Sequence, residues 1–564
     1  MRSLCAPNKR VLMMGIIAVL LVLLLAGCGG GSKGSQDSSA GDGQGVPARE
    51  KIIILSASDV PNIDPGVGQD YGSTTALINM YDTLVFPDHD GNIKPWLATD
   101  WKASEDGLTW TFQLRQGVKF HNGDELTAED VVFSMERLLA MGEGFAFLFT
   151  DLIKEAKAKD AYTVEFTLNK PFGPFLSIIN RLFVLNKKQV LANLKPGPYG
   201  EMGDYGKDWL VTNDAGSGPY MVKELKMQEH LYAVKYDDFW GGWDKDAPDA
   251  FKIVGTTEAS TLRTMMTRRE LDITDQWQTE ESLKGLEQIN GVGIATFSSG
   301  AMYDIMLNTK KPPTDDVHFR KALCYAFDYK TVLEKLFPAQ TPAIGPVDSA
   351  VPGHNPNLYQ YTFNIEKAKE ELAKSKYANN PGEYPVEFMW NTVVPDQEKI
   401  ALLFQSTVEQ LGINVNITKA PWLSYIDLVA SPETTPNVSI VIHDLLYDEA
   451  GAMLESRYHS KSTGTFQQAE WLQDPTIDAL IEDALSTVNK EERFAKYQVI
   501  QEKIVDLAPT IWAFEQAERR AYQEGDWLIW PTIERVKQGL PVTRVMPYNF
   551  YFADFKVYPE KMPK

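Results

Sequence analysis

The stretch DGLTWTFQLRQGVKFHNGDELTAEDVVFS, residues 106–134, carries two adjacent local patterns that decide the fold class. After the Asp106-Gly107 turn signal, apolar residues alternate with polar ones, as in a half-buried strand, at Trp110, Phe112 and Leu114. Thr127 and Asp130 then have the spacing of a capping box, and the helix that follows has an apolar stripe of Val131, Met135, Leu138 and Leu139. A strand followed closely by an amphipathic helix predicts mixed α and β structure.

The same two kinds of signal recur along the chain. Residues 51–56 form a short apolar run that predicts a buried strand, and Tyr162 begins a second alternating strand that continues through Val164, Phe166 and Leu168. A late helix is expected to start at Asn489 and to stop before Pro509, with apolar positions at Phe494, Tyr497, Ile500, Ile504 and Leu507. Because the signals are mixed and no repeat period is present, we predict an α/β or α+β protein.

Composition limits the function classes. The chain has 564 residues, of which 44% are hydrophobic and 23% charged, and this is the composition of a globular protein of several domains. Its formal net charge of −21 makes it a poor partner for nucleic acid.

The first fifty residues indicate export and anchoring. Arg2, Lys9 and Arg10 precede an apolar run over 11–25, which is typical of a signal peptide and short for a spanning helix. The order Leu-Ala-Gly-Cys at residues 25–28 resembles the lipobox of bacterial lipoproteins, in which the cysteine is acylated and becomes residue one. We therefore expect a signal peptide over 1–27, lipidation of Cys28, a flexible tether over 28–49 and an extracytoplasmic location on the cell membrane.

No motif in the chain indicates catalysis or cofactor binding. The seven histidines lack zinc-protease spacing, and neither a G-x-S-x-G elbow nor a Walker phosphate loop is present. The single G-x-G-x-x-G match, at residues 29–34, follows no strand and is attributed to low complexity. Cys324 lies in an apolar helical run and is interpreted as a core residue. We expect no enzymatic activity and no cofactor. With 76 acidic residues in the chain, the sequence leaves open the alternative of a carboxylate pair that acts as in glycosidases.

Two acidic segments have alternative interpretations. Residues 88–92 resemble the start of a calcium loop, but position 99 is Thr where a bidentate Glu is needed, so a hairpin turn is favoured. Asp244, Asp246 and Asp249 are close enough in sequence for a cation site, and a solvated loop is again favoured.

Several segments together resemble the family-5 extracytoplasmic solute-binding proteins of ABC importers, which include dipeptide- and oligopeptide-binding proteins. The resemblance is carried by residues 106–134, by a G-S-G-P-Y turn at 216–220, and by an N-T…P-P…D…R-K-A-L-C-Y-A-F-D pattern over 308–328. The closing segments at 474–481 and 492–509 match as well, so the resemblance runs in order from about 50 to 520.

The resemblance implies a two-lobed α/β periplasmic-binding-protein (Venus flytrap) fold with an extra insertion domain in lobe I. Lobe I is then expected to comprise residues 50–84, 215–303 and 515–564, and the insertion domain residues 85–214. Lobe II is expected over 304–514. The chain would cross between the lobes near 303–308 and 511–516, and closure about these crossings would bury a ligand in the interlobe cleft.

A peptide ligand requires a partner for its α-ammonium, since an unpaired buried charge is costly. In the family's peptide-binding members, an Asp in a loop that follows a lobe II strand supplies it. Residues 438–443 predict that strand here, and Asp444 and Asp448 follow it. Their spacing is one residue longer than the family pattern and both prolines are missing, so an ordinary loop role is an equal alternative.

An oligosaccharide ligand would instead use aromatic platforms, as in the family's sugar-binding members. Trp277, Tyr303, Trp390 and Trp422 are the aromatic candidates for the cleft, with core packing as the alternative for each. The resemblance thus implies a monomeric lipoprotein that captures an oligopeptide, or alternatively an oligosaccharide, and delivers it to an ABC permease in the membrane. An extracellular hydrolase and a sensor on the same scaffold are the competing functions.

Overall fold

The computed structural model describes residues 50–562. The expected signal peptide, Cys28 and the tether lie outside the described residues. Within 50–562, none of the helices combines the length and the apolar character that crossing a bilayer requires.

The stretch that predicted the fold forms both expected elements. Strand β5 spans Thr109–Leu114 and buries its three alternating apolar residues. Helix α2 spans Ala128–Met141, begins with the Thr127–Asp130 capping box and ends at Gly142, which is in the left-handed conformation with φ of 66°. Glycine adopts this conformation without the steric cost that a side chain adds. Both local predictions are confirmed.

Strand β5 belongs to an antiparallel sheet of order β4-β5-β7-β6, in which β4 is Ala98–Ala103, β6 is Ile153–Asp160 and β7 is Thr163–Leu168. Helix α2 packs on this sheet against β6 and β7. The hairpin of β2 (Val85–Pro87) and β3 (Ile93–Pro95) encloses residues 88–92, so the predicted turn is confirmed. Short helices complete this region, namely α3 (Phe175–Ile179), α4 (Lys187–Leu191) and α5 (Lys207–Leu210).

A second sheet joins the start of the described chain to residues almost 200 positions later. Its order is β1-β10-β9-β8, formed by β1 (Ile52–Ala57), β8 (Tyr220–Lys226), β9 (His230–Lys235) and β10 (Ala250–Gly255). Strand β1 is parallel to β10, and its apolar run is buried as predicted. The helices near this sheet in sequence are α1 (Tyr71–Met80), α6 (Ala259–Thr267), α7 (Glu280–Glu287) and, from the C-terminal segment, α16 (Pro531–Lys537).

The third sheet has the order β13-β12-β14-β11-β15. Its strands are β11 (Val292–Leu307), β12 (Val386–Asn391), β13 (Val415–Ala420), β14 (Val438–His443) and β15 (Thr510–Gln523). Helices α8 (Val317–Ala326), α10 (Ile365–Leu372), α11 (Gln397–Val408) and α12 (Trp422–Val429) accompany it. Cys324, on α8, is fully buried in the core beneath this sheet, as its apolar context predicted.

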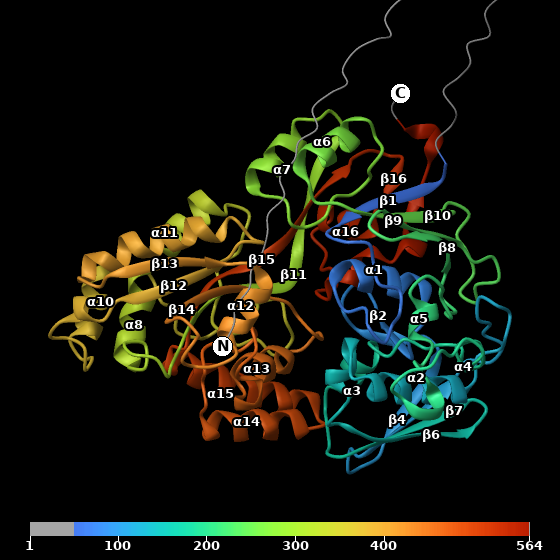
Figure 1. The fold of residues 1–564 in the computed structure, drawn as a ribbon, viewed down its shortest axis with the longest axis horizontal. Coiled ribbons are helices and arrows are strands. Elements are labelled where there is room, and N and C mark those ends of the chain that lie inside the picture. Colours follow the sequence, from blue (N-terminus) through green and yellow to red (C-terminus); the bar gives the residue numbers. More distant parts are fainter. Residues whose placement is uncertain (1–49, 563–564) are drawn as a thin grey trace, which may run out of the picture. The chain divides into compact units, whose positions relative to one another are not determined.

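The long strands β11 and β15 connect the second and third sheets. They pair with each other along most of their length, and isolated bridges from Tyr522 to Ile273 and from Ile273 to Leu55 extend the pairing to β1. In Figure 1 these two strands run between the β12–β14 group on one side and the β1, β8–β10 group on the other.

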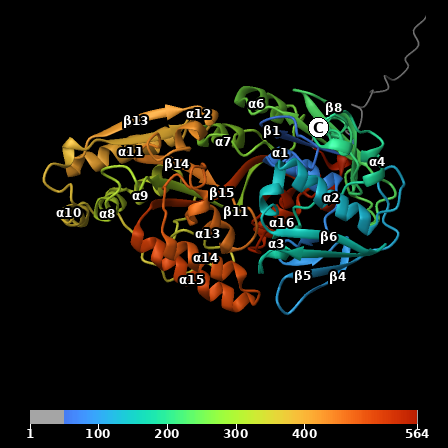
Figure 2. The same cartoon turned by 60° about the horizontal axis from the view of Figure 1, so that its bottom comes forward.

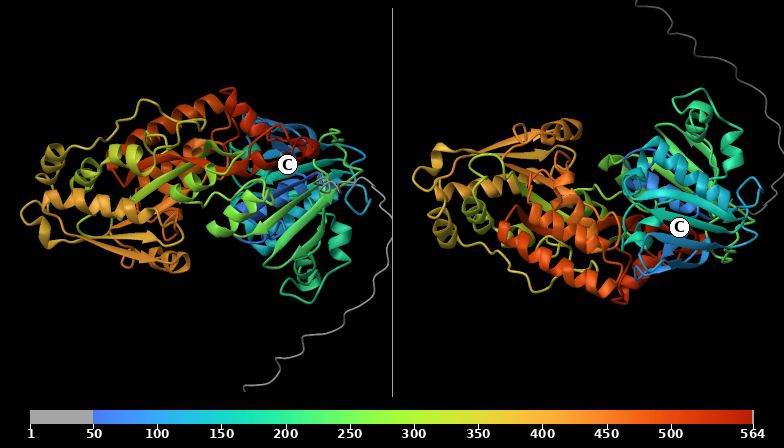
Figure 3. Two further views of the ribbon diagram at one scale, coloured as in Figure 1. Left: turned by 90° about the horizontal axis from the view of Figure 1, so that it is seen from above. Right: turned by 90° about the horizontal axis from the view of Figure 1, so that it is seen from below.

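Helices α13 (Ala450–Tyr458), α14 (Pro475–Ser486) and α15 (Lys490–Leu507) form a separate cluster. Figures 2 and 3 show this cluster, in orange to red, next to the region of α3 and β6. The amide of Gly173 donates to the carbonyl of Leu485 at 2.8 Å, so the two regions are in direct contact. The start of α15 after Asn489 and its end before Pro509 agree with the sequence prediction.

Candidate functional site

The loop over residues 444–449 is held at the carboxyl end of β14. Strand β14 is interior to its sheet, and α13 begins immediately after Glu449. Glu449 is buried and accepts hydrogen bonds from Arg493 at 2.6 and 2.9 Å and from the hydroxyl of Tyr497 at 2.7 Å. The ion pair between Glu449 and Arg493 of α15 therefore fixes the end of the loop that begins with Asp444.

Asp444 lies where β14 faces α1. The hydroxyl of Tyr71, at the first position of α1, donates to its carboxylate. Solvent reaches Asp444, but the surrounding protein reduces its solvation enough to raise its pKa to about 7; Glu518 adds to the rise and Arg457 opposes it. Among residues 50–562 no Lys, Arg or His side chain forms an ion pair with Asp444.

One further acid, Glu518, acts directly on Asp444, and Asp275 acts in turn on Glu518. Glu518 on β15 is buried and pairs with Arg520 at 2.5 Å. Burial raises the pKa of the Asp275 carboxyl, and Arg520 lowers it. Burial also raises the pKa of Glu518, with Arg520 opposing and Asp275 adding to the rise. Two carboxyls, those of Glu518 and Asp275, thus lie near Arg520, and Glu518 is also close enough to Asp444 to raise its pKa.

A pocket opens next to this acidic group, between the end of β12, the middle of β15 and the segment before α7. It contains about 610 Å³ of space free of protein atoms, part of it open to solvent. Trp277 and Tyr303 line it, together with Phe337, Val393, Asp396, Ile442, Phe514 and Gln516. Tyr303 stacks on Phe514 with ring centroids 4.5 Å apart.

Trp277 connects the pocket to Asp444. Its ring makes an edge contact with Tyr71 at 5.9 Å, and Tyr71 is the residue that donates to Asp444. The backbone amide of Trp277 donates to Asp275 at 2.8 Å, which fixes the segment before α7. The structure therefore brings Trp277 and Tyr303 to one pocket and connects that pocket to Asp444 through Tyr71.

The other predicted site residues lie elsewhere. Trp390 is 5% exposed and packs in the core of the third sheet. Trp422 stacks on Tyr425 at 5.6 Å in a separate small cluster. Asp448 is paired with Arg544 through two hydrogen bonds of 2.8 and 2.7 Å.

Tyr71 and Glu518 were not found from the sequence. Tyr71 follows the N-cap Asp70 in an ordinary helix start, and Glu518 alternates with other residues of a long strand, so neither carries a local signal of ligand contact. Within the described residues no group of three or more His, Cys, Asp or Glu side chains has a metal-binding arrangement. Asp244, for example, pairs with Lys556 at 2.9 Å.

Comparison with known proteins identifies the family. The model of bacterial extracellular solute-binding proteins, family 5 (middle), matches residues 92–464, which is more than half of the chain. The chain belongs to this family. Family 5 comprises binding proteins rather than enzymes, and the expected resemblance is confirmed.

Family-5 relatives cover most of the chain. The "Probable D,D-dipeptide-binding periplasmic protein DdpA" of Escherichia coli K12 is 29% identical over 477 residues, 83% of this chain and 89% of that protein. Heme-binding protein A of Haemophilus influenzae is 26% identical over 525 residues, 87% of this chain and 91% of that protein. The structure of the periplasmic binding protein DppA from Helicobacter pylori, in complex with the peptide STSA, has a TM-score of 0.73 at 22% identity and covers 90% and 98% of the two chains. The expected periplasmic-binding-protein fold is thereby confirmed.

Proposed function

We propose that this family-5 protein is the lipid-anchored, extracytoplasmic substrate-binding subunit of an ABC importer, and that it captures a peptide. The observation that carries the proposal is Asp444, a carboxylate that solvent reaches and that no basic side chain of residues 50–562 pairs with. Its neighbour Glu518 adds negative charge. A ligand ammonium placed there gains favourable charge interactions, whereas a neutral sugar gains none.

Hinge closure is proposed to enclose the ligand. The sheets support the boundaries given above, since β1 and β8–β10 fall within the proposed lobe I, β4–β7 within the insertion domain and β12–β14 within lobe II. Both crossings, 303–308 and 511–516, fall within or at the end of β11 and β15, which pair with each other. A pair of long strands can bend at such points while the lobes move as bodies.

The membrane anchor and the permease partner belong to the same proposal. Cys28 and its lipobox-like context support acylation, and family membership supports delivery to a permease. Replacing Cys28 with Ala is expected to abolish incorporation of radiolabelled palmitate into the protein, as measured by immunoprecipitation and autoradiography. Incorporation equal to that of the wild type would contradict acylation at this residue.

The peptide assignment is tested with residues 50–564 and trialanine. We expect native mass spectrometry to detect co-purified peptides and calorimetry to show that Asp444→Asn weakens trialanine binding about 100-fold, because one charged partner of a buried pair is lost. N-acetyl-trialanine is expected to bind the wild type weakly, and Asp444→Asn is expected not to weaken it further. Asp427→Asn, at an exposed position on α12, is the matched control. Equal affinity of the wild type and the Asp444→Ala/Asp448→Ala double variant would contradict the ammonium role.

An oligosaccharide is the second candidate, because Trp277 and Tyr303 line the same pocket. Masses differing by a hexose or pentose unit in the native spectra would favour it. In that case Trp277→Ala is expected to abolish binding and Asp444→Asn to change it little.

A further inference from the structure

The carboxyl end of β14, which leads into Asp444, contacts a buried cluster of charged side chains. Asp304 on β11, His443 at the end of β14 and Arg457 on α13 are each at most 1% exposed. The Nδ1 atom of His443 lies 2.7 Å from a carboxylate oxygen of Asp304, and Nη1 of Arg457 donates to the same oxygen at 3.2 Å. Two strands and a helix therefore meet at one carboxylate.

Arg457 also contacts the backbone next to Asp444. Its Nη2 atom donates to the carbonyl of His443 at 3.3 Å, and this carbonyl belongs to the peptide bond that joins His443 to Asp444. A guanidinium presents its donors in a rigid planar fork, so contacts through two different nitrogens restrict its orientation. The peptide bond before Asp444 is thus tied to a buried ion pair.

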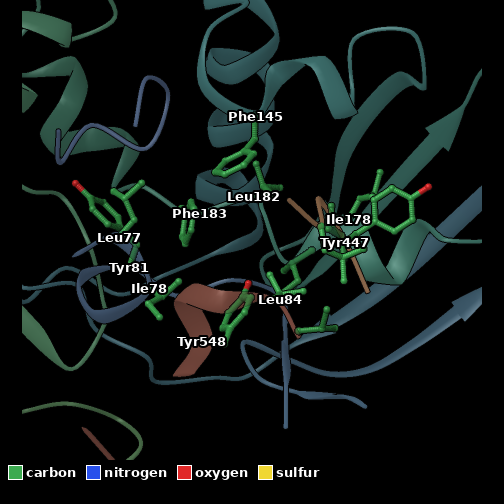
Figure 4. Packing of buried hydrophobic residues seen from close by; sticks show 14 of the residues in the cluster. Leu77, Ile78, Tyr81, Leu84, Phe145, Ile178, Leu182, Phe183, Tyr447 and Tyr548 are labelled. Atoms are coloured by element: carbon green, nitrogen blue, oxygen red, sulfur yellow. The ribbon is translucent and has the colours of Figure 1, made fainter. Parts of the chain in front are cut away.

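The rest of the loop is held by contacts of another kind. Figure 4 shows Tyr447 within a cluster of buried apolar residues, and Glu449 forms the ion pair with α15 described above. Both residues follow Asp444 in the chain, whereas the contact of Arg457 lies before it. Asp444 is therefore fixed from both sides, and Arg457 supplies the contact at the strand end.

The same arginine acts on the charge of Asp444. Loss of solvation and Glu518 on β15 raise the pKa of Asp444, and Arg457 lowers it. The hydroxyl of Tyr71 on α1 donates to the Asp444 carboxylate. Of these three neighbours Arg457 alone is basic, so it favours the ionised carboxylate, which is the form that a cation binds.

The other titratable groups around Arg457 leave its charge in place at neutral pH. Burial and Arg457 lower the pKa of His443, and Asp304 raises it, so the imidazole is neutral. Burial raises the pKa of Glu470 to about 8, with Asp304 adding to the rise and Arg457 opposing it, so this carboxyl is mostly protonated. Arg457 and Asp304 are then the charged members of the cluster. Arg457 also lowers the pKa values of two further groups, Asp348 and Tyr458.

We propose that Arg457 is the positioning residue of Asp444, which holds the end of β14 through Asp304 and the His443 carbonyl and keeps Asp444 ionised for a cationic ligand. This inference rests on the proposed binding of a ligand ammonium at Asp444. Because Arg457 is fully buried, it acts on the ligand only through Asp444.

The test measures trialanine affinity by calorimetry as a function of pH, in the wild type and in Arg457→Met. Affinity is expected to rise with pH as Asp444 loses its proton. Without the guanidinium, the pKa of Asp444 is expected to increase by about one unit, so the rise moves to higher pH. Arg457→Met is then expected to bind about tenfold more weakly than the wild type at about pH 6, and less than about twofold more weakly at about pH 8.5. Arg457→Lys keeps the charge, so the rise is expected at the wild-type pH.

A double variant keeps the test valid if Arg457→Met does not fold, since the single change leaves Asp304 buried without its charged partner. Arg457→Met/Asp304→Asn removes both charges, and the rise is again expected to move to higher pH. The matched control is Arg137→Met/Asp64→Asn, which removes a buried arginine–aspartate pair between α2 and the segment before α1. No shift of the rise is expected in this control.

Two results would overturn the proposal. Equal loss of affinity at every pH in Arg457→Met would show a purely structural role, and a rise that stays at higher pH in Arg457→Lys would show that the charge is not the cause. If the wild type binds no peptide, the proposed function has failed, and NMR of protein with isotope-labelled aspartate then follows Asp444 without a ligand. The Asp444 signal is identified by its absence in Asp444→Asn. A higher pKa of Asp444 in Arg457→Met than in the wild type supports the role of Arg457, and equal pKa values overturn it.

Discussion

At the scale of single residues, the pKa of Asp444 is set by residues from distant segments rather than by its neighbours in sequence. The protein around it and the nearby Glu518 disfavour the charged form, and Arg457 favours it, so the pKa reaches about 7. A ligand ammonium interacts with the ionised form, so binding at acidic pH requires the removal of a proton from Asp444. Ligand affinity and Asp444 ionisation are therefore linked.

This linkage predicts a bell-shaped dependence of trialanine affinity on pH. Affinity is expected to rise between about pH 5 and 7, up to tenfold per unit, as Asp444 loses its proton. It is expected to fall above about pH 8, where the α-amino group of the peptide becomes neutral. Calorimetry at constant ionic strength measures both limbs. The acidic limb is expected to disappear in Asp444→Asn and to persist in Asp427→Asn; a flat profile in the wild type would contradict the assignment.

Local patterns predicted some residues of the site and could not predict others. The position of Asp444 follows from a buried strand and the acid after it, both of which are visible in sequence. Trp277 and Trp390 look equivalent in sequence, but one lines the pocket and the other packs in the core, because that difference depends on which strands meet. Arg137 and Arg493 look like ordinary solvated cations in sequence, but each is buried against a carboxylate from a distant segment, Asp64 and Glu449 respectively.

At the scale of elements, capping and periodicity were sufficient to place β5, α2 and α15, since each is specified by neighbouring residues. The pairing of β1 with β10 and of β11 with β15 joins segments some 200 residues apart, and no local signal encodes it. Helix α15 shows how such long-range contacts serve the site. Its Arg493 and Tyr497 hold Glu449, the residue that ends the Asp444 loop.

We predict that Arg493→Met destabilises the protein by about 3–5 kcal/mol, because it leaves Glu449 buried without its charged partner. Trialanine affinity is expected to fall as well, since the loop loses its anchor. Lys496→Met on the same helix removes a partly exposed pair with Asp483 and is expected to change stability by less than about 1 kcal/mol. Urea unfolding followed by tryptophan fluorescence measures both variants. Similar midpoints for the two variants would contradict an anchoring role for α15.

At the scale of the whole molecule, contacts between the proposed lobes govern how readily the cleft closes. Asp448 of the proposed lobe II pairs with Arg544 of the proposed lobe I, and Lys399 pairs with Glu281 at 3.0 Å. The apparent affinity of a ligand that requires the closed form scales with the population of that form. Residues that never contact the ligand can therefore change affinity through closure.

The Asp448–Arg544 pair separates this indirect effect from direct ligand contact. Asp448→Asn is expected to weaken trialanine and N-acetyl-trialanine by the same factor, about tenfold, because the closed form loses a largely buried ion pair. Arg544→Met is expected to reproduce the effect, and the double variant is expected to add nothing further, since both changes remove one interaction. Small-angle scattering of the ligand-free variants is expected to show a larger radius of gyration than the wild type. A different result would instead make Asp448 the ammonium partner. In that case Asp448→Asn would weaken the binding of trialanine but not that of N-acetyl-trialanine, and Arg544→Met would leave both affinities unchanged.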